Sequence, residues 1–536
     1  MPKSNVVKQF KDSKVAVDAY FAESALPDLK TYFGRVRKGE SQVFDTPFAR
    51  GESTEDLLQA WRDELVSISD KWPSLYAYEE EMASKVGPMS IMKPLKERMS
   101  DIDSYYEGIL LPSKPISHSA IAAVVGEWSS VRGLKVRGQR ATVDKMKKST
   151  SSGNPYFSKR RTVVDATLPA YVSTLYSEVL QTLSGKEWRS CALLGWRGQE
   201  GGPLVSDVKQ RVVWMFPFGV NINELQVYQP MIEAAQKFNL VPAWVSMESV
   251  DKGITKLFDT KNSDDLVVCT DFTKFDQHFN SSLQAAAKSM IAAIFNGDAS
   301  IRLWIDEVFP IKFMIPMMYD YGKVRTGAHG MGSGSGGTNA DETLAHRALQ
   351  YEAAIVNRAR LNPNSQCLGD DGILTYPGIT VKDVVDAYSV HGLEMNESKQ
   401  YASTQDCIYL RRWHHQNYRI DGVCAGVYST MRALGRLRYL ERYQKPEYWG
   451  SVAVALRQLS ILENVKYHPL RDQFAEFCMK RDKYRLGIDI PGFLDNITKH
   501  AKKLVDHMPD FLGYTRTLQT EGDPIHGIVS WWIVID

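Results

Sequence analysis

Three aspartates stand where the surrounding sequence would leave a carboxylate at the end of a strand or at the tip of a turn. Asp271 lies near the end of residues 265–272, DLVVCTDF, while Asp370 and Asp371 belong to the segment LGDDG. A sheet that joined these segments would bring three carboxylates together, and like charges that close need cations to stay ionised. Hard oxygen ligands suit Mg²⁺, and two such ions can clamp the attacking and leaving oxygens of a phosphoryl transfer. The pattern therefore predicts a metal-dependent nucleotidyl-transfer site.

The sequence around the acids predicts the elements that would position them. The β-branched valines of residues 265–272 favour a buried strand, and residues 366–376, QCLGDDGILTY, have the two arms of a tight hairpin. A Gly-Asp-Asp triplet alone is also typical of an ordinary turn, and average residue usage gives one by chance in roughly one of ten chains of this length. The metal-site interpretation therefore depends on the neighbouring segments.

Helical and glycine-rich segments surround the predicted strands. Residues 327–339, GAHGMGSGSGGTN, form a glycine-dense loop that leads into a long helical pattern. Residues 381–390 are helical again, and residues 407–415, CIYLRRWHH, have strand character. Between the first strand and the glycine loop, the apolar positions that share one helix face are Phe279, Leu283, Ala287, Met290 and Ile294, with Gly297 as the predicted stop.

Both ends of the chain are predicted to be helical. Near the N-terminus, Ser53 and Asp56 have the spacing of a helix-capping pair and precede apolar residues at helical intervals. From residue 447 onward the pattern is mostly helical, which predicts a separate C-terminal helical subdomain. Strands and helices alternate between these regions. The predicted fold class is therefore α+β, with a mixed core between helical lobes.

Composition limits the classes to which the chain can belong. Its 536 residues require several subdomains or domains, and its 43% hydrophobic and 24% charged residues exclude overall disorder. There is no run of eighteen apolar residues and no secretory signal, and the six cysteines are scattered singly. We therefore expect a soluble chain in a reducing compartment, without a membrane partner. The net charge of +2 does not by itself indicate a polyanionic partner, so that evidence has to come from locally charged segments.

One segment is locally basic. Residues 131–161 contain ten lysines and arginines and a single acid, Asp144. The small turn-forming residues of STSSGNPYF, residues 149–157, predict that these cations are presented by a loop. A solvated surface is the alternative, and charge alone favours it by roughly two to one.

Taken in order, the motifs resemble those of the viral RNA-dependent RNA polymerases. The set consists of D-x4-D at Asp271 and Asp276, S-G-x-x-x-T from Ser333 to Thr338, and G-D-D at residues 369–371. The forms DFTKFDQHFN, SGSGGTN and LGDDG are most similar to those of picobirnaviruses, which carry two double-stranded RNA segments. The similarity extends over the whole chain. It implies a right-hand architecture with an antiparallel-sheet palm between helix-rich fingers and thumb. The implied ranges are 1–265 for the N-terminal region and fingers, with early palm elements, 266–415 for the palm core, and 416–536 for the thumb and C-terminal tail.

The resemblance assigns roles at the acidic site. Asp271 and Asp370 would hold two divalent ions, Mg²⁺ or Mn²⁺, and Asp371 would assist from the hairpin tip. Lys399 matches a lysine thought to protonate the leaving pyrophosphate, with a solvated loop lysine as the alternative. Asp276 stands where reverse transcriptases carry a bulky aromatic, and its carboxylate would accept a hydrogen bond from the ribose 2′ hydroxyl.

The resemblance also implies contacts with the triphosphate and with RNA. Lys209 and Arg211 in VKQRVVW match a strand whose basic side chains face the incoming triphosphate. The guanidinium of arginine offers a fixed fork to phosphate oxygens. The residues assigned to RNA are Thr150, Ser151 and Gly153 of the fingers motif, Lys159, Arg160 and Arg161 after it, and Arg411 and Arg412 of the strand that grips the primer.

One position departs from the family pattern. Ser333 and Thr338 match the loop that approaches the template and the nucleotide, and many relatives carry an asparagine four residues after the threonine. This chain has Glu342 at that place, and Asn339 is the nearby asparagine. Asn339 is therefore the candidate for the ribose contact, unless the helix is shifted in register.

The implied activity is template-directed transfer of ribonucleotides to an RNA 3′ hydroxyl, in transcription and genome replication of a double-stranded RNA virus. The implied partners are single-stranded RNA template, nascent RNA and ribonucleoside triphosphates, with capsid protein as a further partner of a monomeric enzyme. We expect it in the virion interior and in the host cytoplasm during replication. Two alternatives remain: a reverse transcriptase, which would share the acids and the fold, and a catalytically idle RNA-packaging protein with a polymerase fold.

The C-terminal end, EGDPIHGIVSWWIVID, is rich in aromatic and apolar residues. The favoured interpretation is a final strand that packs on the helical lobe. The alternative is that Trp531, Trp532 or a nearby loop reaches into the cavity and stacks on the first nucleotide.

Overall fold

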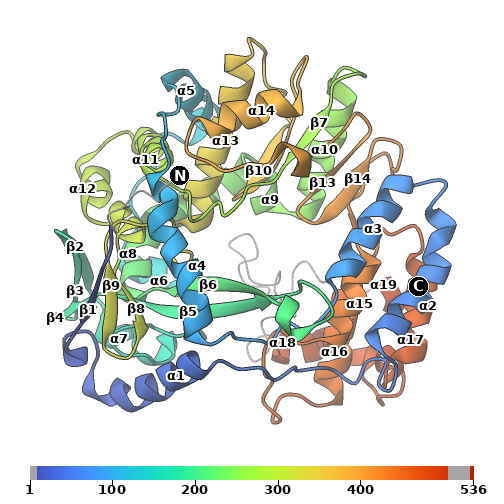
Figure 1. Ribbon diagram of the computed structural model, residues 1–536, viewed down its shortest axis with the longest axis horizontal. Coiled ribbons are helices and arrows are strands. Elements are labelled where there is room, and N and C mark those ends of the chain that lie inside the picture. Colours follow the sequence, from blue (N-terminus) through green and yellow to red (C-terminus); the bar gives the residue numbers. More distant parts are fainter. Residues whose placement is uncertain (1–8, 505–531, 536) are drawn as a thin grey trace, which may run out of the picture.

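A four-stranded antiparallel sheet carries the three predicted acids (Figure 1). The structure is a computed structural model that describes residues 9–504 and 532–535. The valine-rich central strand β7 is buried along its whole length, as the apolar run predicts for a strand that is covered on both faces. In sheet order, the strands are β10 (Gln366–Leu368), β11 (Asp371–Leu374), β7 (Val267–Thr270) and β12 (Tyr401–Ser403).

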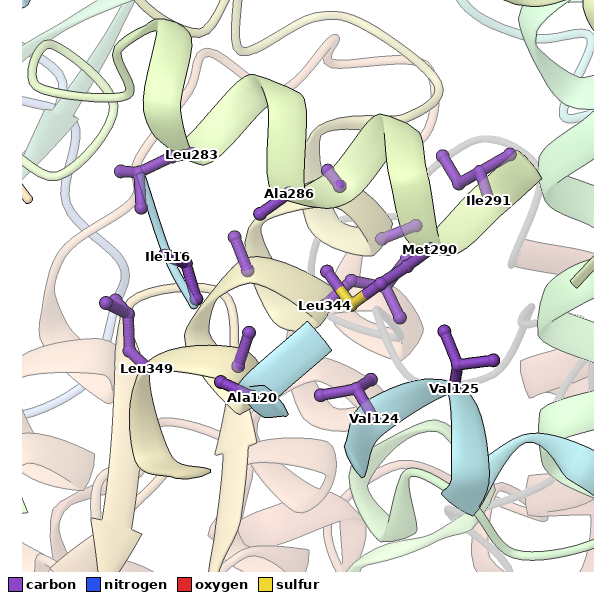
Figure 2. Packing of buried hydrophobic residues seen from close by; sticks show 14 of the residues in the cluster. Ile116, Ala120, Val124, Val125, Leu283, Ala286, Met290, Ile291, Leu344 and Leu349 are labelled. Carbon is purple, nitrogen blue, oxygen red and sulfur yellow. The ribbon is translucent and has the colours of Figure 1, made fainter. Parts of the chain in front are cut away.

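Four helices share a continuous hydrophobic core with this sheet. Figure 2 shows Met290 of α11 beside Leu344 of α13, while Leu283 of the same helix lies above Ile116. The predicted helical stripe of residues 279–294 lies in this core, which confirms that interpretation. The helices of this region are α5 (His118–Glu127), α11 (Ser281–Ile294), α13 (Thr338–Val356) and α14 (Val381–Ser389).

Helices from both ends of the chain share a second hydrophobic core. Trp61 of α2 and Leu75 of α3 are buried with Leu434 of α15 and Phe474 of α17. Figure 1 shows α2 and α3, in blue, beside the orange and red C-terminal helices. The predicted helical C-terminal region therefore has N-terminal members as well. These helices are α2 (Thr54–Leu65), α3 (Pro73–Lys85), α15 (Thr430–Arg438), α16 (Ser451–Glu463), α17 (Arg471–Arg481) and α18 (Ile497–Leu504).

Two predictions near the chain ends have different outcomes. The capping pair is confirmed, because Ser53 Oγ accepts a hydrogen bond from the Asp56 N–H at 3.0 Å. The predicted final strand is wrong, because α19 (Trp532–Ile535) is helical. The indole of Trp532 is buried among helices and donates to the Leu462 carbonyl at 3.1 Å, so α19 packs on the helical core. Trp531 lies outside the described residues.

A five-stranded sheet carries the predicted basic strand. Its order is β1–β9–β8–β5–β6, and Arg197 of β5 lies opposite Arg211 of β6. Figure 1 shows β5 and β6 extending toward the C-terminal helices. The strands are β1 (Lys11–Lys14), β5 (Ala192–Gln199), β6 (Lys209–Met215), β8 (Met317–Asp320) and β9 (Lys323–Thr326), and the helices nearby are α1 (Leu26–Lys38), α4 (Leu95–Glu107) and α8 (Phe218–Lys237).

Residues 407–415 form a hairpin, so the prediction of one strand is wrong there. Leu410 and Arg411 adopt left-handed φ angles of 52° and 58° and make the turn between β13 and β14. Neither residue is a glycine or an asparagine, which removes the usual sequence signal of such a turn. The strands of this sheet are β13 (Asp406–Tyr409), β14 (Arg412–His415) and β15 (Val427–Tyr428).

A three-stranded sheet, β2–β3–β4, and several short helices complete the described fold. No described helix is both long enough and apolar enough to cross a bilayer. The six cysteines are all free and buried. The strands and helices of this part are β2 (Ala170–Leu175), β3 (Glu178–Leu183), β4 (Lys186–Arg189), α6 (Gln139–Asp144), α7 (Val164–Thr167), α9 (Pro242–Val245), α10 (Met247–Thr260) and α12 (Ala299–Glu307).

Candidate active site

Elements that lie far apart in the sequence line one cavity with a volume of about 1560 Å³. Its walls come from β6, the end of β7, the β10–β11 hairpin, α3 and α15, which Figure 1 shows arranged around the middle of the molecule. The cavity gathers ten of the residues that the sequence predicts for the site: Lys209, Arg211, Asp271, Asp276, Ser333, Thr338, Asp370, Asp371, Lys399 and Arg411.

Asp271 directly follows β7, and one side chain fixes its backbone. The Asp271 N–H donates to Gln400 Oε1 at 2.7 Å, and Gln400 Nε2 donates to the Asp271 carbonyl at 2.9 Å. Gln400 can reach both groups because β12, the strand that follows it, pairs with β7. Partial burial raises the pKa of Asp271, and the ammonium groups of Lys399 and Lys85 oppose this rise.

Asp370 stands at the tip of the predicted hairpin, which the structure confirms. Leu368 pairs with Asp371, so that Gly369 and Asp370 are the two turn residues. Gly369 has a φ of +59°, a left-handed conformation that glycine adopts without strain. Burial raises the pKa of Asp370, the negative charge of Asp276 raises it further, and Arg211 opposes both effects.

Side chains of α13 hold this hairpin tip. Thr343 Oγ1 accepts from the Gly369 N–H at 2.9 Å, and His346 Nδ1 donates to the Gly369 carbonyl at 2.8 Å. Burial lowers the pKa of His346 to about 4, so its ring is neutral at physiological pH. A Cβ added at Gly372 would lie 2.5 Å from His346 Cε1, so this position has no room for a side chain. The turn is therefore anchored on a rigid helix.

Asp371 begins β11 beside Asp271. The pairing of Gly372 with Thr270 brings the two aspartates to adjacent ends of neighbouring strands. Asp371 Oδ2 accepts from the Leu410 N–H at 2.8 Å, which ties the carboxylate to the β13–β14 turn. Burial raises the pKa of Asp371 to about 7, even though the Leu410 N–H lowers it.

The three carboxylates are suitable ligands for a divalent cation. Within residues 9–504 and 532–535, no three acidic, histidine or cysteine side chains are already close enough together to hold a metal ion. The donor chemistry nevertheless fits, because hard carboxylate oxygens are the ligands that Mg²⁺ and Mn²⁺ prefer. Burial raises the pKa of Asp271, Asp370 and Asp371 alike. A bound cation would favour the ionised form of each.

Four basic side chains line the same cavity without an ion-pair partner among the described residues: Lys209, Arg211, Lys274 and Lys399. Side chains alternate along a strand, so Lys209 and Arg211 project from the same face of β6. Lys399 is the ammonium group that most strongly lowers the pKa of Asp271, and it therefore lies near that carboxylate. Cations without an internal partner can bind phosphate oxygens of a ligand.

The glycine loop of residues 327–339 lies directly against β6 and against the segment that contains Asp276. A Cβ added at Gly334 would lie 1.6 Å from the Trp214 carbonyl oxygen, and one at Gly330 would lie 2.3 Å from the Asp276 carbonyl oxygen. The Trp214 N–H donates to Ser333 Oγ at 3.4 Å. Glycine is thus required at these two positions because two backbones approach closely.

A buried carboxylate supports the loop from the other side and connects it to Arg160. Glu224 accepts from the hydroxyl of Ser335 and, at 3.1 Å, from the Gly336 N–H. Asn221 donates to Glu224 at 3.0 Å and accepts from the Arg160 guanidinium at 2.7 Å. Burial lowers the pKa of Arg160 to about 10, and the side chain does not line the cavity. Arg160 thus supports the loop through Asn221, and its contact with RNA stays a prediction.

The structure gives Asn339 a hydrogen-bond partner inside the protein. Its Oδ1 accepts from the Trp244 indole at 2.7 Å, and the residue does not line the cavity. Glu342, one helical turn further along α13, lines the cavity instead. Asn339 also lies near the hairpin tip, because a Cβ added at Gly369 would be 3.9 Å from Asn339 Nδ2 and 3.6 Å from Glu342 Oε2. The ribose contact of Asn339 stays a prediction.

The two arginines of the β13–β14 hairpin have different environments. Arg411 lies in the turn, lines the cavity and is 3.7 Å from Glu200. Arg412 is buried, pairs with Asp251 at 3.4 Å and donates to the Gly426 carbonyl at 2.7 Å. The prediction that Arg412 grips the primer is therefore corrected, because its charge is used inside the protein. The other predicted RNA contacts that do not line the cavity are Thr150, Ser151, Gly153, Lys159 and Arg161.

Several cavity residues were not predicted from the sequence. Lys85 of α3 and the arginines Arg432 and Arg436 of α15 line the same cavity as the three aspartates. Arg432 pairs with Glu200 at 2.8 Å, which joins α15 to the end of β5. The local sequence does not identify these residues as part of the site, because long-range packing brings them to the cavity.

With this geometry established, the chain can be compared with known proteins. A family model described as viral RNA-dependent RNA polymerase matches residues 127–444. The chain belongs to the viral RNA-dependent RNA polymerases. This polymerase is 58% identical over 514 residues to a protein of a human picobirnavirus (strain Human/Thailand/Hy005102/-) called a potential RNA-dependent RNA polymerase, and the match covers 95% of this chain and 96% of the relative.

Crystal structures of a human picobirnavirus RNA-dependent RNA polymerase share the fold of this polymerase. One matches with a TM-score of 0.93 and 56% identity, and it covers 98% of this chain and 99% of that chain. An insertion loop deletion mutant of a human picobirnavirus RNA-dependent RNA polymerase matches with a TM-score of 0.90 and 57% identity. This match covers 92% of this chain and 97% of that chain. The predicted α+β right-hand fold is therefore confirmed.

The family sets the class of reaction. This picobirnavirus-type polymerase is an RNA-directed nucleotidyltransferase, so its substrates are an RNA template and nucleotides. Polymerases of the family use divalent metal ions. The reverse transcriptase and the catalytically idle packaging protein, which were open as alternatives, are no longer favoured by any observation.

Proposed function

We propose that this polymerase transfers ribonucleotides to an RNA 3′ hydroxyl by two-metal-ion catalysis, in transcription and genome replication of a double-stranded RNA virus. The observation that carries the proposal is the shared cavity, which is lined both by Asp271, Asp370 and Asp371 and by basic side chains without ion-pair partners. Acids of this kind suit metal ions, and the basic groups suit a triphosphate.

Asp271 and Asp370 would hold the two ions, with Asp371 in support. The ions, when bound, would lower the pKa of the 3′ hydroxyl and neutralise charge on the phosphates. The chain itself keeps the ligands in place: Gln400 fixes the backbone of Asp271, and the Leu410 N–H fixes one oxygen of Asp371. Such preorganised positions avoid the cost of reorienting groups during the reaction.

The basic residues would bind the triphosphate and protonate the leaving pyrophosphate. Arg211 presents a planar fork that can bind two phosphate oxygens, and Lys209 adds a point charge from the same face of the strand. Lys399, close to Asp271, would give its proton to the leaving pyrophosphate. Charge-assisted hydrogen bonds of this kind are about twice as strong as neutral ones.

The template and product RNA would follow the basic surfaces. Arg411, Arg432 and Arg436 line the cavity near the two hairpin tips and α15. Lys159 and Arg161 are exposed outside the cavity, with Thr150, Ser151 and Gly153 close by in sequence, and would contact template before it enters. Such phosphate contacts are strong, independent of base sequence and weakened by salt.

The test is incorporation of labelled ribonucleotides on a defined single-stranded RNA template. The native chain should incorporate label, and Asp370→Ala should reduce the rate by on the order of a hundredfold to a thousandfold, because a metal ligand is lost. Asp264→Asn is the matched control, since Asp264 is an exposed aspartate outside the cavity, and its rate should equal that of the native chain. A native rate in Asp370→Ala would overturn the proposal.

We also propose that the enzyme acts as a monomer in the virion interior and in the host cytoplasm, with capsid protein as a partner. Similarity to a picobirnavirus protein is what supports this proposal. Sedimentation of the purified chain tests the monomer, and purification of particles with polymerase activity inside them tests the location. A stable dimer, or particles without the chain, would contradict it.

A further inference from the structure

Two carboxylates lie in the basic part of the cavity wall, and both are held by arginines. Glu200 directly follows β5, and Glu441 lies shortly after α15. Their side chains are only 14% and 17% exposed. These acids belong to an ion-pair cluster whose six members all line the cavity: Arg197, Glu200, Arg411, Arg432, Arg436 and Glu441.

Glu200 is shared by two arginines from different parts of the fold. Its Oε1 lies 2.8 Å from Nε of Arg432, on α15, and 3.7 Å from Nη1 of Arg411, in the β13–β14 turn. Burial acts to raise the pKa of Glu200, but the charges of Arg432 and Arg436 lower it below its ordinary value. Glu200 is therefore ionised at neutral pH.

Glu441 makes the opposite connection. Its Oε1 lies 2.7 Å from Nε of Arg197, on β5, and its Oε2 lies 3.6 Å from Nη1 of Arg436, on α15. Figure 1 shows β5 and β6 extending toward α15. The ion-pair cluster therefore ties the end of the five-stranded sheet to α15 at this wall of the cavity.

The ion-pair cluster contains more positive than negative charge. Its two carboxylates face four arginines. Burial lowers the pKa of Arg411, and the like charge of Arg432 lowers it further. Arg197 and Arg411 remain 42% and 47% exposed, so a ligand in the cavity can reach them. An excess of positive charge attracts a polyanion, and the planar guanidinium binds phosphate oxygens with the same fork that it offers to a carboxylate.

We propose that Glu200 and Glu441 compete with RNA for the arginines of the ion-pair cluster. They hold the guanidinium groups when the cavity contains no RNA, and backbone phosphates replace them when template and product enter. One ion pair is then exchanged for another, so RNA gains less binding free energy than it would from unoccupied arginines. Weaker binding of the backbone lets the duplex move by one nucleotide after each addition. The inference rests on the proposed function, because it assumes that RNA occupies this cavity.

Two variants release the arginines without changing the size of the acid. Glu441→Gln and Glu200→Gln keep the shape of the side chain and an oxygen that accepts a hydrogen bond, but they remove the negative charge. Glu248→Gln is the matched control, since it makes the same change of net charge at an exposed acid outside the cavity, 3.4 Å from Lys252. The measurement is filter binding of a short labelled RNA duplex with a single-stranded template overhang, at several salt concentrations and without nucleotide or divalent ions.

We expect Glu441→Gln and Glu200→Gln each to bind this RNA about three- to tenfold more tightly than the native chain, the range for one added hydrogen-bonded contact. The slope of log K against log salt should become steeper by about 0.7 to 0.9 for each arginine released. Glu248→Gln should have the native affinity and slope. Native or weaker RNA binding in either folded acid variant would overturn the inference. So would equally tight binding by Glu248→Gln, because it would make net charge the cause.

Thermal unfolding shows whether each variant folds. If only one acid variant folds, that variant decides, because each acid holds its own arginines. If neither folds, Arg197→Gln replaces them. Arg197 is held by Glu441, so it contacts RNA only after release, and its loss should make the slope shallower by about one charge. A native slope in Arg197→Gln would overturn the inference.

The two proposals fail in different ways. A native chain that binds RNA but incorporates no ribonucleotide would refute the proposed function. An active native chain whose acid variants bind RNA no more tightly than it does would refute only the competition by Glu200 and Glu441.

Discussion

Acidification should weaken the binding of divalent ions, because a cation has to displace the proton of Asp371. Burial raises the pKa of this carboxyl group to about 7, although the hydrogen bond from the Leu410 N–H acts to lower that pKa. With that pKa, the ionised fraction is about 0.09 at pH 6 and about 0.9 at pH 8. If the ion binds only the ionised form, the apparent Kd for Mn²⁺ should be about tenfold higher at pH 6 than at pH 8.

The same shift determines how stability without metal depends on pH. The folded state of Asp371 holds its proton more tightly than the unfolded chain, whose carboxyl group has an ordinary pKa of 3.8. Stability from this group is therefore fully present at low pH and declines as the pH rises from about 4 to about 7. Added Mn²⁺ should raise the unfolding temperature more at pH 8 than at pH 6.

Calorimetric titration of Mn²⁺ into the protein at the two pH values measures the effect. Asp371→Asn is the matched variant, because its amide does not titrate, and the tenfold pH dependence should become smaller in it. Equal Kd values for the native chain at both pH values would refute the reasoning. An undiminished pH dependence in Asp371→Asn would show that another group is responsible.

Three further substitutions test the remaining assignments. Arg412→Ala should lower the free energy of unfolding by about 3 kcal/mol, since it leaves the buried carboxylate of Asp251 without its guanidinium partner. The folded variant should bind RNA with native affinity. Urea unfolding and filter binding measure the two quantities, and weaker RNA binding with native stability would instead support the prediction that Arg412 grips the primer. Arg411→Ala should do the reverse, weakening RNA binding and reducing its salt dependence by about one charge. Glu79→Gln should cost about 2 kcal/mol, because the buried carboxylate accepts from the Thr430 N–H at the start of α15 at 2.8 Å, and a cost below about 0.5 kcal/mol would contradict that role.

The acidic centre could be predicted because its signals are local. The valines of β7, the two arms around Gly369 and the helix after Phe279 each follow from nearest-neighbour pattern, and the structure confirms all three. The register that puts Asp371 next to Asp271 then follows from pairing two apolar strands. What the sequence could not supply is the support of these groups by Gln400, His346 and Thr343, which depends on tertiary contacts.

The sequence could not predict the direction of a side chain where that direction depends on distant residues. Arg411 and Arg412 are neighbours, and only the left-handed turn, formed by residues without glycine, separates the cavity residue from the buried one. Arg160 stands in a basic segment, yet its partner Asn221 lies on a helix far along the chain. Asn339 and Glu342 both lie near Gly369, and the bond of Asn339 to the Trp244 indole depends on a residue far away in the sequence.

The sequence also could not predict that helices from the two chain ends pack together. Each helix is amphipathic by itself, and periodicity does not reveal the partner that covers an apolar face. Trp61 packs with Phe474, more than four hundred residues later, in a ring contact at 4.9 Å. The position of Lys85 and Arg432 in the cavity wall is a consequence of that packing.

The central claim is that an aspartate at a strand end and one at a hairpin tip share divalent ions. The most direct measurement is a crystal structure of the protein with Mn²⁺, a template and a nucleotide, in which anomalous scattering locates each ion independently of its surroundings. We predict anomalous peaks within bonding distance of carboxylate oxygens of both Asp271 and Asp370. Peaks that touch neither side chain, or only one of them while nucleotide is bound, would contradict the account.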